Sequence, residues 1–213
     1  MFLTRLTLGL LGANCYLVQD ESGAEGIIID PGGDADEVCE ACRRLGLDPL
    51  YIVNTHAHID HIGADGELKE RFPRARLCIG RGDAALLASP AGNLSAMFEP
   101  GAVVPPPDVL LDDGDELAAG ACVLKVIETP GHTPGHICLI ARGEEPHVVF
   151  CGDLIFKDGV GRTDLPGGDS EALLRSIRER VLTLPQDTRL LPGHGEPTTV
   201  GAEAGAFLGT WST

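Results

Sequence analysis

Aromatic residues are scarce in this chain. They make up 4% of its 213 residues, with one tryptophan, two tyrosines and six phenylalanines. A core has to be built instead from aliphatic side chains, which are plentiful because hydrophobic residues make up 43% of the chain. That fraction and the length are enough for one sizeable hydrophobic core. We therefore expect a single domain over residues 1–213.

Basic residues are also few. The chain has 16 lysines and arginines against 32 aspartates and glutamates, and its net charge is −16. An acidic surface repels the phosphates of nucleic acids and of anionic membranes, so neither is an expected partner. An anionic substrate would need a local basic anchor. No run of about 20 apolar residues is present, so no segment is expected to span a membrane.

A disulfide framework is not expected. The seven cysteines are an odd number, and most of them lie in apolar runs. Buried, reduced thiols are typical of a cytoplasmic protein, and we expect that location. Residues 6–15 are fairly apolar and end at Cys15, but Asn14 is not the small residue that precedes the cysteine of a lipoprotein signal. Cys39 and Cys42 form a lone CxxC inside a predicted helix, where packing is the expected role.

Short apolar runs and amphipathic stretches alternate along the chain. They predict strands at residues 2–8, 15–19, 26–30, 50–53, 76–80, 121–128, 136–141, 147–151 and 189–191. They predict helices at residues 34–45, 65–71, 82–88 and 170–182. Residues 89–109 are rich in proline and glycine and are expected to form a loop with the character of a mobile flap. The mixture indicates an α/β arrangement in layers.

Residues 55–63 hold four metal-seeking side chains within six positions: His56, His58, Asp60 and His61. Neutral imidazole is the commonest metal ligand. A carboxylate among histidines is typical of Zn, Fe or Mn. In an extended backbone His56 and His58 point the same way, whereas the neighbours Asp60 and His61 point in different directions. The cluster is therefore suited to two ions rather than one.

Three later segments each place a further candidate ligand directly after a short predicted strand. These residues are His132, Asp153 and His194. Glycines and prolines flank them and let the backbone turn tightly towards a shared centre. Seven candidates exceed the needs of one tetrahedral ion, but they fit two ions if one carboxylate, best Asp153, bridges both. Such a pair activates water for hydrolysis.

The histidine cluster, followed in order by His132, Asp153 and His194, resembles the metallo-β-lactamase superfamily. The resemblance covers nearly the whole chain and implies a four-layer αββα sandwich with the metals at one edge of its two sheets. It implies one ion on His56, His58 and His132, a second on Asp60, His61 and His194, and Asp153 as the bridge. Asp60 and Asp153 would be the catalytic carboxylates. The implied cofactor is two divalent metal ions, zinc first, with iron or manganese as alternatives.

Within the superfamily the chain is most similar to the glyoxalase II-like (hydroxyacylglutathione hydrolase-like) group. The similarity lies in residues 14–18, 129–136, 152–157 and 161–164. It implies hydrolysis of a small acyl-thiol such as S-D-lactoylglutathione, with a hydroxide between the metals attacking the thioester carbonyl. The expected partner is therefore a small-molecule substrate.

The chain departs from the well-studied glyoxalase II enzymes at its end. Only 19 residues follow His194, so we expect no C-terminal helical domain of the kind that grips glutathione. The thiol carrier therefore stays open. Arg162 matches the position of a substrate-binding lysine, and we expect it to contact substrate together with Lys157 and Thr163. The alternative for residues 162–164 is a solvated loop with an internal ion pair.

Other functions stay open. The similarity also permits a persulfide dioxygenase with a single iron on His56, His132 and Asp153. A lactonase or a β-lactamase is a further alternative, and a nuclease is disfavoured by the net charge of −16. A metal-stabilised binding module is the alternative to an enzyme.

Roles can also be expected for four other polar residues. Asp30 and Thr55 either orient a ligand histidine or cap a turn. His136 and His147 are expected to be structural.

Overall fold

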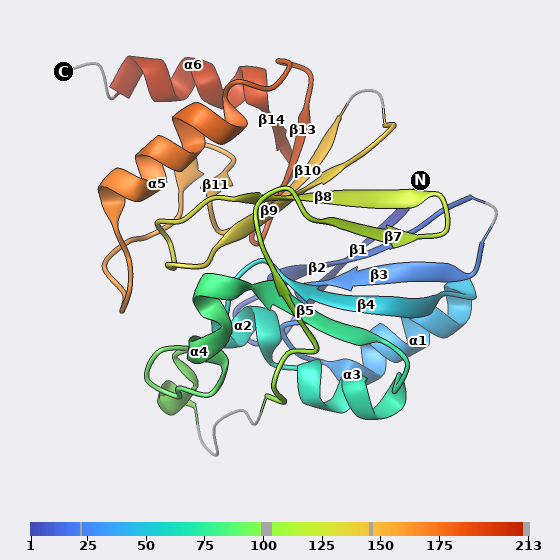
Figure 1. The fold of residues 1–213 in the computed structure, drawn as a ribbon. Helices are drawn as coiled ribbons and strands as arrows, with labels where there is room; N and C mark the ends of the chain where they lie inside the picture. The colour runs from blue at the N-terminus through green and yellow to red at the C-terminus, as the bar shows by residue number, and fades with distance from the viewer. Residues whose placement is uncertain (22, 99–103, 145–146, 211–213) are drawn as a thin grey trace.

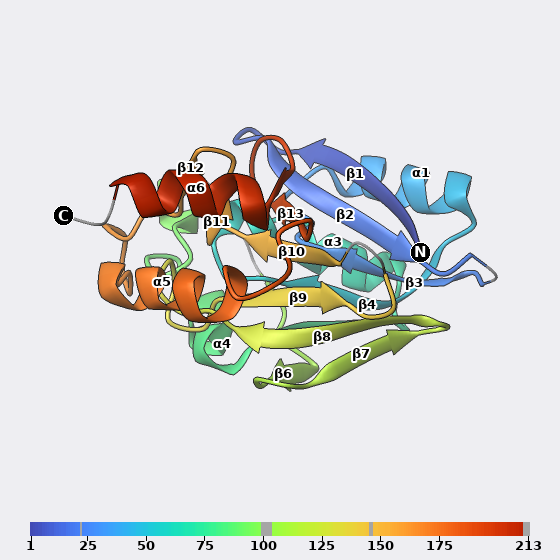
Figure 2. The same ribbon diagram turned by 90° about the horizontal axis from the view of Figure 1, so that it is seen from above.

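The computed structural model describes residues 1–21, 23–98, 104–144 and 147–210. Two mixed sheets pack face to face, and helices cover their outer faces (Figure 1). Figure 2 shows the two sheets one above the other, with their strands running in roughly the same direction. The expected four-layer αββα sandwich is confirmed.

The first sheet has the strand order β1-β2-β3-β4-β5-β6. Its strands are β1 (Phe2–Leu8), β2 (Ala13–Gln19), β3 (Glu25–Ile29), β4 (Asp48–Asn54), β5 (Arg76–Gly80) and β6 (Val109–Leu111). The first three strands pair antiparallel, and β3 to β6 pair parallel. On its outer face lie α1 (Ala35–Leu45) and α3 (Asp65–Arg71).

The second sheet has the strand order β14-β13-β10-β9-β8-β7. Its strands are β7 (Glu116–Ala119), β8 (Cys122–Glu128), β9 (Ile137–Ala141), β10 (Val148–Gly152), β13 (Arg189–Pro192) and β14 (Thr198–Thr199). A small hairpin of β11 (Ile155–Phe156) and β12 (Gly159–Val160) follows β10. The outer helices are α5 (Ser170–Ser176), continued by a π-helical turn over Ile177–Val181, and α6 (Val200–Thr210).

The core between the sheets is mainly aliphatic, as the composition predicts. Val18 and Ile27 from the first sheet pack in one cluster with Val126 and Leu139 from the second. The cluster includes one edge-on aromatic pair, Tyr16 and Phe150, with ring centroids 5.2 Å apart, and Tyr51 packs against it. Similar aliphatic clusters bind the outer helices to each sheet. The seven cysteines are free thiols, and all but Cys39 are buried.

The strand ends place the candidate ligands at one edge of the sandwich. β4 ends at Asn54 and leads into the histidine cluster through α2 (Ile59–Ile62). In the other sheet, β8, β10 and β13 end just before the loops that carry the three later candidates. Because β10 and β13 run parallel, their carboxyl ends meet at the same edge.

Several elements differ from the expectations. β6 begins at Val109, the last residue of the segment expected to be a loop, and a 3-10 turn, Ser95–Met97, lies inside that segment. Residues 99–103 of the expected flap lie outside the described residues. β7, β14 and α6 carried no clear periodic signal. The predicted helix at 82–88 is split into a 3-10 turn, Arg81–Asp83, and α4 (Ala84–Leu87). Among the described residues, no helix combines the length and apolar character needed to cross a bilayer.

Candidate metal centre

All seven predicted ligands converge at the edge where the strands end. Their donor atoms fall into three overlapping triplets, and within each triplet the atoms lie no more than 4.8 Å from one another. The triplets are His56, His58 and His132; His56, His61 and Asp153; and Asp60, His61 and His194. Side chains separated by up to 138 positions in the sequence thus face one small volume.

The loop after β4 arranges its own four residues. His58 is extended, with φ −70° and ψ 147°, and it immediately precedes the single turn of α2. That turn carries Asp60 and His61 at its two middle positions. The main-chain N–H of Ile59 donates to the carbonyl of Asn93 at 2.9 Å, which ties the start of α2 to the segment after α4. Because of the extended stretch and the short helix, the metal-binding atoms of this one loop are divided between neighbouring triplets.

The tautomer of His56 follows from its neighbours. The Thr55 hydroxyl donates to Oδ2 of Asp30 at 2.7 Å, because a carboxylate can only accept. The same hydroxyl lies 3.1 Å from Nδ1 of His56 and, having used its hydrogen, must accept there. Nδ1 of His56 therefore carries the proton. Its Nε2 is left as a lone pair, and this atom is buried without a hydrogen-bond partner.

Two more imidazoles contact groups that orient their rings. Nδ1 of His132 lies 2.7 Å from the main-chain carbonyl of Arg162, which can only accept, so Nδ1 carries the proton and Nε2 carries the lone pair that can bind a metal. Nδ1 of His61 lies 3.1 Å from Oδ2 of Asp30, and its Nε2 faces Asp153. Asp30 and Thr55 thus orient ligand histidines, which was one of the two roles expected for them.

Asp153 lies between the triplets. Its Oδ1 is 3.4 Å from Nε2 of His61, and its Oδ2 is 3.7 Å from Nε2 of His132 and 3.8 Å from Nε2 of His194. Among the seven side chains, this carboxylate therefore reaches histidines on both sides of the centre. This is the arrangement that a bridging carboxylate needs.

The protonation of the centre suits a cation. Burial and the neighbouring His61 lower the pKa of His56 well below its usual value. Burial and His132 lower the pKa of His58 to about 4. Burial opposes ionisation of Asp153, but His61 and the other histidines lower its pKa. Neutral imidazoles and ionised carboxylates are the forms that bind divalent metals.

His61 is the exception. Burial would lower its pKa, but the carboxylates of Asp153 and Asp30 together raise it well above its usual value. A metal bound at Nε2 of His61 must therefore displace a proton, so metal binding at this position depends on pH.

Several buried polar atoms in the centre have no hydrogen-bond partner within the protein. They include Nε2 of His56, Nε2 of His61 and Oδ1 of Asp153. A buried polar atom without a hydrogen bond lowers the stability of the folded protein. Ring nitrogens of His58 and His132 also face each other at 2.9 Å across the same volume. Divalent ions would satisfy all of these atoms at once, so the residues fit a metal centre.

Comparison with known proteins agrees with this geometry. The model of the metallo-β-lactamase superfamily matches residues 8–194. The chain belongs to the metallo-β-lactamase superfamily.

Two relatives match over nearly their full lengths. The probable metallo-hydrolase YqgX of Bacillus subtilis is 38% identical over 201 residues, which is 93% of this chain and 92% of that protein. The hydroxyacylglutathione hydrolase GloC of Haemophilus influenzae is 36% identical over 191 residues, 89% of each chain. Membership in the superfamily and similarity to a metal-dependent hydrolase are therefore established from two directions.

Solved structures of the superfamily are similar too. The crystal structure of BLEG-1 B3 metallo-β-lactamase superposes with a TM-score of 0.89 at 36% identity, covering 96% of this chain and 97% of the other. TTHA1623 in a di-iron-bound form superposes with a TM-score of 0.80 at 38% identity, covering 94% and 96%. The superfamily's His/Asp cluster therefore supports a divalent metal centre here, without fixing the element.

Glycines keep this metallo-β-lactamase centre open. A Cβ on Gly193 would lie 2.2 Å from Oδ1 of Asp153 and 2.6 Å from Cε1 of His61. A Cβ on Gly161 would lie 1.8 Å from the carbonyl oxygen of Asp153. A side chain at Gly193 would displace the Asp153 carboxylate, and one at Gly161 would displace the Asp153 main chain, so close approach of the backbone is part of the site.

Asp83, which no sequence pattern indicated, supports the centre from behind. Its buried carboxylate accepts hydrogen bonds from the N–H of Ala57 at 3.0 Å, the hydroxyl of Thr133 at 2.7 Å and the N–H of Gly135 at 2.6 Å. Ala57 separates two of the ligand histidines, and Thr133 follows His132. One carboxylate thus joins the two loops that supply the first triplet.

Two residues near the N-terminus hold the loop of His194. The side-chain amide of Asn14 donates to the carbonyls of Pro192 and Gly195 at 3.0 and 2.9 Å, and the Tyr16 hydroxyl donates to Pro192 at 2.7 Å. Their backbone also helps, because Asn14 N–H donates to the Gly193 carbonyl at 2.7 Å.

Of the expected substrate-binding residues, Arg162 contacts the centre through its main chain. The Arg162 carbonyl reaches His132, whereas its guanidinium makes a two-pronged ion pair with Asp164 at 2.7 and 2.8 Å and its side chain is 62% exposed. Lys157 is exposed on the turn between β11 and β12, and Thr163 is half-buried. His136 is buried beside the centre, with Nδ1 2.9 Å from the Thr129 hydroxyl.

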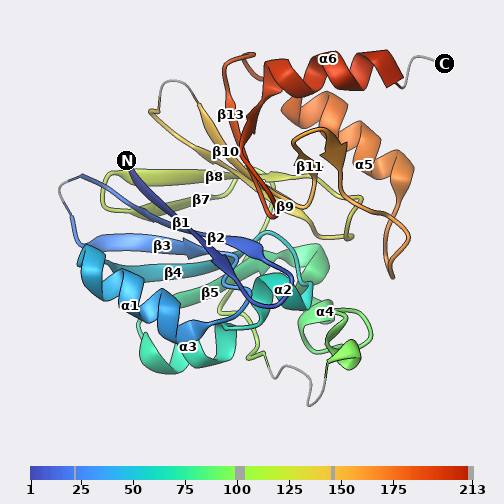
Figure 3. The ribbon, with the colours of Figure 1, turned by 180° about the vertical axis from the view of Figure 1, so that it is seen from behind.

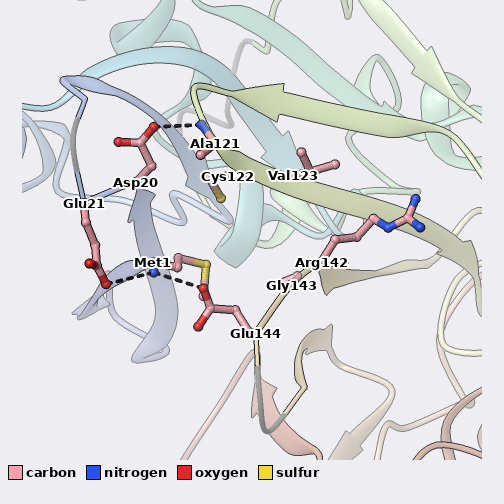
Figure 4. Close-up of a pocket in the computed structure, with 10 residues that line it drawn as sticks. Met1, Asp20, Glu21, Ala121, Cys122, Val123, Arg142, Gly143 and Glu144 are labelled. Carbon is pink, nitrogen blue, oxygen red and sulfur yellow. Dashed lines mark hydrogen bonds and ion pairs between the residues drawn. The ribbon is translucent and has the colours of Figure 1, made fainter.

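A cavity of about 340 Å³ lies where β1 begins and β9 ends, at the ends of these strands away from the metal centre (Figure 4). The amino terminus in this cavity contacts Glu144 at 3.0 Å and Glu21 at 3.5 Å, and Arg142 pairs with Glu116 outside it. The Asp20 carboxylate accepts from the Ala121 N–H at 2.7 Å. These groups are already engaged, so the chemistry of the protein is assigned to the metal centre.

Proposed function

We propose that this protein hydrolyses thioesters of small acyl-thiols, such as S-D-lactoylglutathione, with two divalent metal ions. The observation that carries the proposal is the position of the Asp153 carboxylate between histidines of both ligand triplets. The similarity to the hydroxyacylglutathione hydrolase GloC supports the substrate class. In this proposal the working unit is one domain over residues 1–213, and the free cysteines support a cytoplasmic location.

The proposed ligands follow from the triplets. His56, His58 and His132 hold one ion, Asp60, His61 and His194 hold the other, and Asp153 is shared. When bound, such a pair supplies an activated water and an electrophile that polarises the thioester carbonyl. Zinc is the first candidate because four-coordinate histidine and carboxylate sites suit it. Iron is the second candidate, because the similar protein TTHA1623 has been solved in a di-iron-bound form.

The protein's own groups have distinct tasks. Asp60 and Asp153 are the catalytic carboxylates: both stay ionised, because histidines lower their pKa values against the effect of burial. Asp30, Thr55 and the Arg162 carbonyl hold the imidazoles with their lone pairs inward. Arg162, Lys157 and Thr163 are proposed to contact the thiol carrier, where the guanidinium would bind a carboxylate.

The test is metal-dependent turnover. Protein loaded with zinc, iron or manganese should hydrolyse S-D-lactoylglutathione with two metal ions per chain, equally well with and without oxygen. Asp153→Asn should lower turnover by at least about 10²-fold and reduce metal content, because it weakens the shared ligand. Asp187→Asn, which makes the same change at an exposed turn, is the matched control.

Three results would redirect the proposal. Oxygen uptake with glutathione persulfide at one iron per chain would indicate the dioxygenase. Turnover of nitrocefin but of no thioester would favour a β-lactamase, which the similarity to BLEG-1 makes the second candidate. Full metal occupancy without turnover of any thioester, lactone or β-lactam would indicate a binding module.

A further inference from the structure

Apolar side chains are exposed beside the metal centre. On the turn between β1 and β2, Leu10 is 95% exposed and Leu11 is 54% exposed. Met97, on the turn after α4, is 76% exposed. Keeping such side chains in water gives up hydrophobic stabilisation, and a cluster of them at one place marks a binding surface.

The two leucines line a cavity of about 180 Å³. Among the described residues, Leu10, Leu11, Ile59 and Phe98 form its apolar walls, and Asp60 is the one charged residue that lines it. A closed apolar cavity of about 150 Å³ is known to accept a benzene ring, so this cavity has room for a chain of about four to six carbons. The described lining residues offer mainly apolar contact.

Asp60 connects this cavity to the metal centre. Its Oδ2 lies 3.1 Å from Nε2 of His194. With 17% and 29% of their side chains exposed, Asp60 and His194 are more open to solvent than His61, which is fully buried, and Asp153, at 13%. The centre therefore opens to solvent on the side where the cavity begins.

The walls of the cavity are held in place relative to the ligands. Gly9 N–H donates to Oδ2 of Asp34 at 2.7 Å, and Ala13 forms a β-bridge with His194. A Cβ on Gly32 would lie 1.6 Å from the carbonyl oxygen of Asp60, so the backbone packs directly against α2 there. In Figure 3 the turn between β1 and β2 lies beside α2.

The geometry points to an acyl subsite: the cavity beside Asp60 receives a short, unbranched apolar chain on the acyl side of the substrate. This inference rests on the proposed function. In the reaction, water adds to the carbonyl carbon, the carbon–sulfur bond breaks, and a carboxylate and a thiol are released. The subsite favours butanoyl and hexanoyl thioesters over acetyl and 2-hydroxyacyl thioesters of the same thiol.

Product binding tests the subsite without requiring turnover. We expect acetate, butanoate and hexanoate to bind zinc-loaded protein with an affinity that rises about fourfold per methylene group, as measured by calorimetry. In the double variant Leu10→Ser/Leu11→Ser, the affinity should increase by less than about twofold per methylene group. Leu45→Ser, an exposed leucine at the end of α1, is the matched control and should keep the full rise. An affinity independent of chain length, or an equal rise in the double variant, would overturn the subsite.

Turnover of S-acyl glutathiones separates the two proposals. We expect kcat/KM to rise from acetyl to hexanoyl in the native protein and the Leu45→Ser control, and to stay nearly flat in the double serine variant. Turnover without chain-length preference would reject the subsite and leave the hydrolase. If carboxylates bind with an affinity that depends on chain length but no thioester is turned over, the subsite is kept and the hydrolase is rejected. If the double variant converts a stable dimer into a monomer in sedimentation, the leucines form an interface between copies and the subsite is wrong.

Discussion

Oδ2 of Asp30 lies 3.1 Å from Nδ1 of His61 at the base of the metal centre. The same carboxylate accepts from the N–H and the hydroxyl of Thr55, both at 2.7 Å, and that hydroxyl lies 3.1 Å from Nδ1 of His56. One buried carboxylate therefore sets the inward-facing nitrogen of two histidines, one directly and one through a hydroxyl.

Asp30→Asn should lower the affinity for metal about 10- to 100-fold, because the neutral amide no longer orients His61 through a charged contact. Asparagine tolerates the left-handed backbone of this position, where φ is 51°, so the fold should survive. Competition with a coloured chelator measures the affinity. Asp158→Asn is the control, since it makes the same change at an exposed position with φ 61°. Equal affinities in the two variants would refute the role of Asp30.

Much of the centre could be predicted from the sequence because its donors lie in compact motifs. His56, His58, Asp60 and His61 stand within six positions, and glycine and proline flank His132 and His194. The strand ends that bring them together could also be predicted, because each strand before them is a short apolar run. The order of layers followed from the resemblance to the superfamily rather than from these patterns.

The supporting residues could not be predicted because their roles arise only when distant segments pack. Asp83 lies 50 positions from Thr133, and Asn14 lies 178 positions from Pro192, so neither contact leaves a local pattern. The contact of Arg162 with His132 uses a main-chain carbonyl, which every residue type has. β6 has three residues, too few for an alternating pattern to be distinguished from a loop.

Gly193→Ala should remove metal from the centre. The added Cβ would lie 2.2 Å from Oδ1 of Asp153, and only a shift of the shared carboxylate or of the His194 loop relieves that clash. We expect less than half of the native metal content by elemental analysis and a lower melting temperature in the presence of zinc. Gly205→Ala, in open space on α6, is the control and should keep both. Native metal content in Gly193→Ala would contradict the need for close backbone approach.

His136 should make stability depend on pH. Burial, with His132 next, lowers the pKa of His136 to about 3, so the folded protein keeps it neutral while the unfolded chain protonates it near pH 6.5. The stability from this group is therefore complete above about pH 6.5 and is lost as the pH falls towards 3. When the pH falls from 7 to 5, the free energy of unfolding should decrease by about 2 kcal/mol more in the native protein than in His136→Phe. Denaturant unfolding of both proteins at the two pH values measures this difference, and parallel losses would show that His136 is not held neutral.

Arg162→Ala should raise KM for anionic thioesters about threefold to tenfold and leave KM for neutral thioesters nearly unchanged, because an exposed charge-assisted contact is modest. Metal content should be unchanged, since alanine keeps the carbonyl that lies 2.7 Å from Nδ1 of His132. Asp164 is the companion residue: Arg162 lowers its pKa to about 2, so it holds the guanidinium at every assay pH. Asp164→Ala frees the guanidinium and should lower KM for the anionic substrates. Steady-state kinetics with S-D-lactoylglutathione and an uncharged acyl-thiol measure both effects. If Arg162→Ala changes KM equally for both substrates, the guanidinium does not bind the carboxylate and the loop serves the centre through its backbone alone.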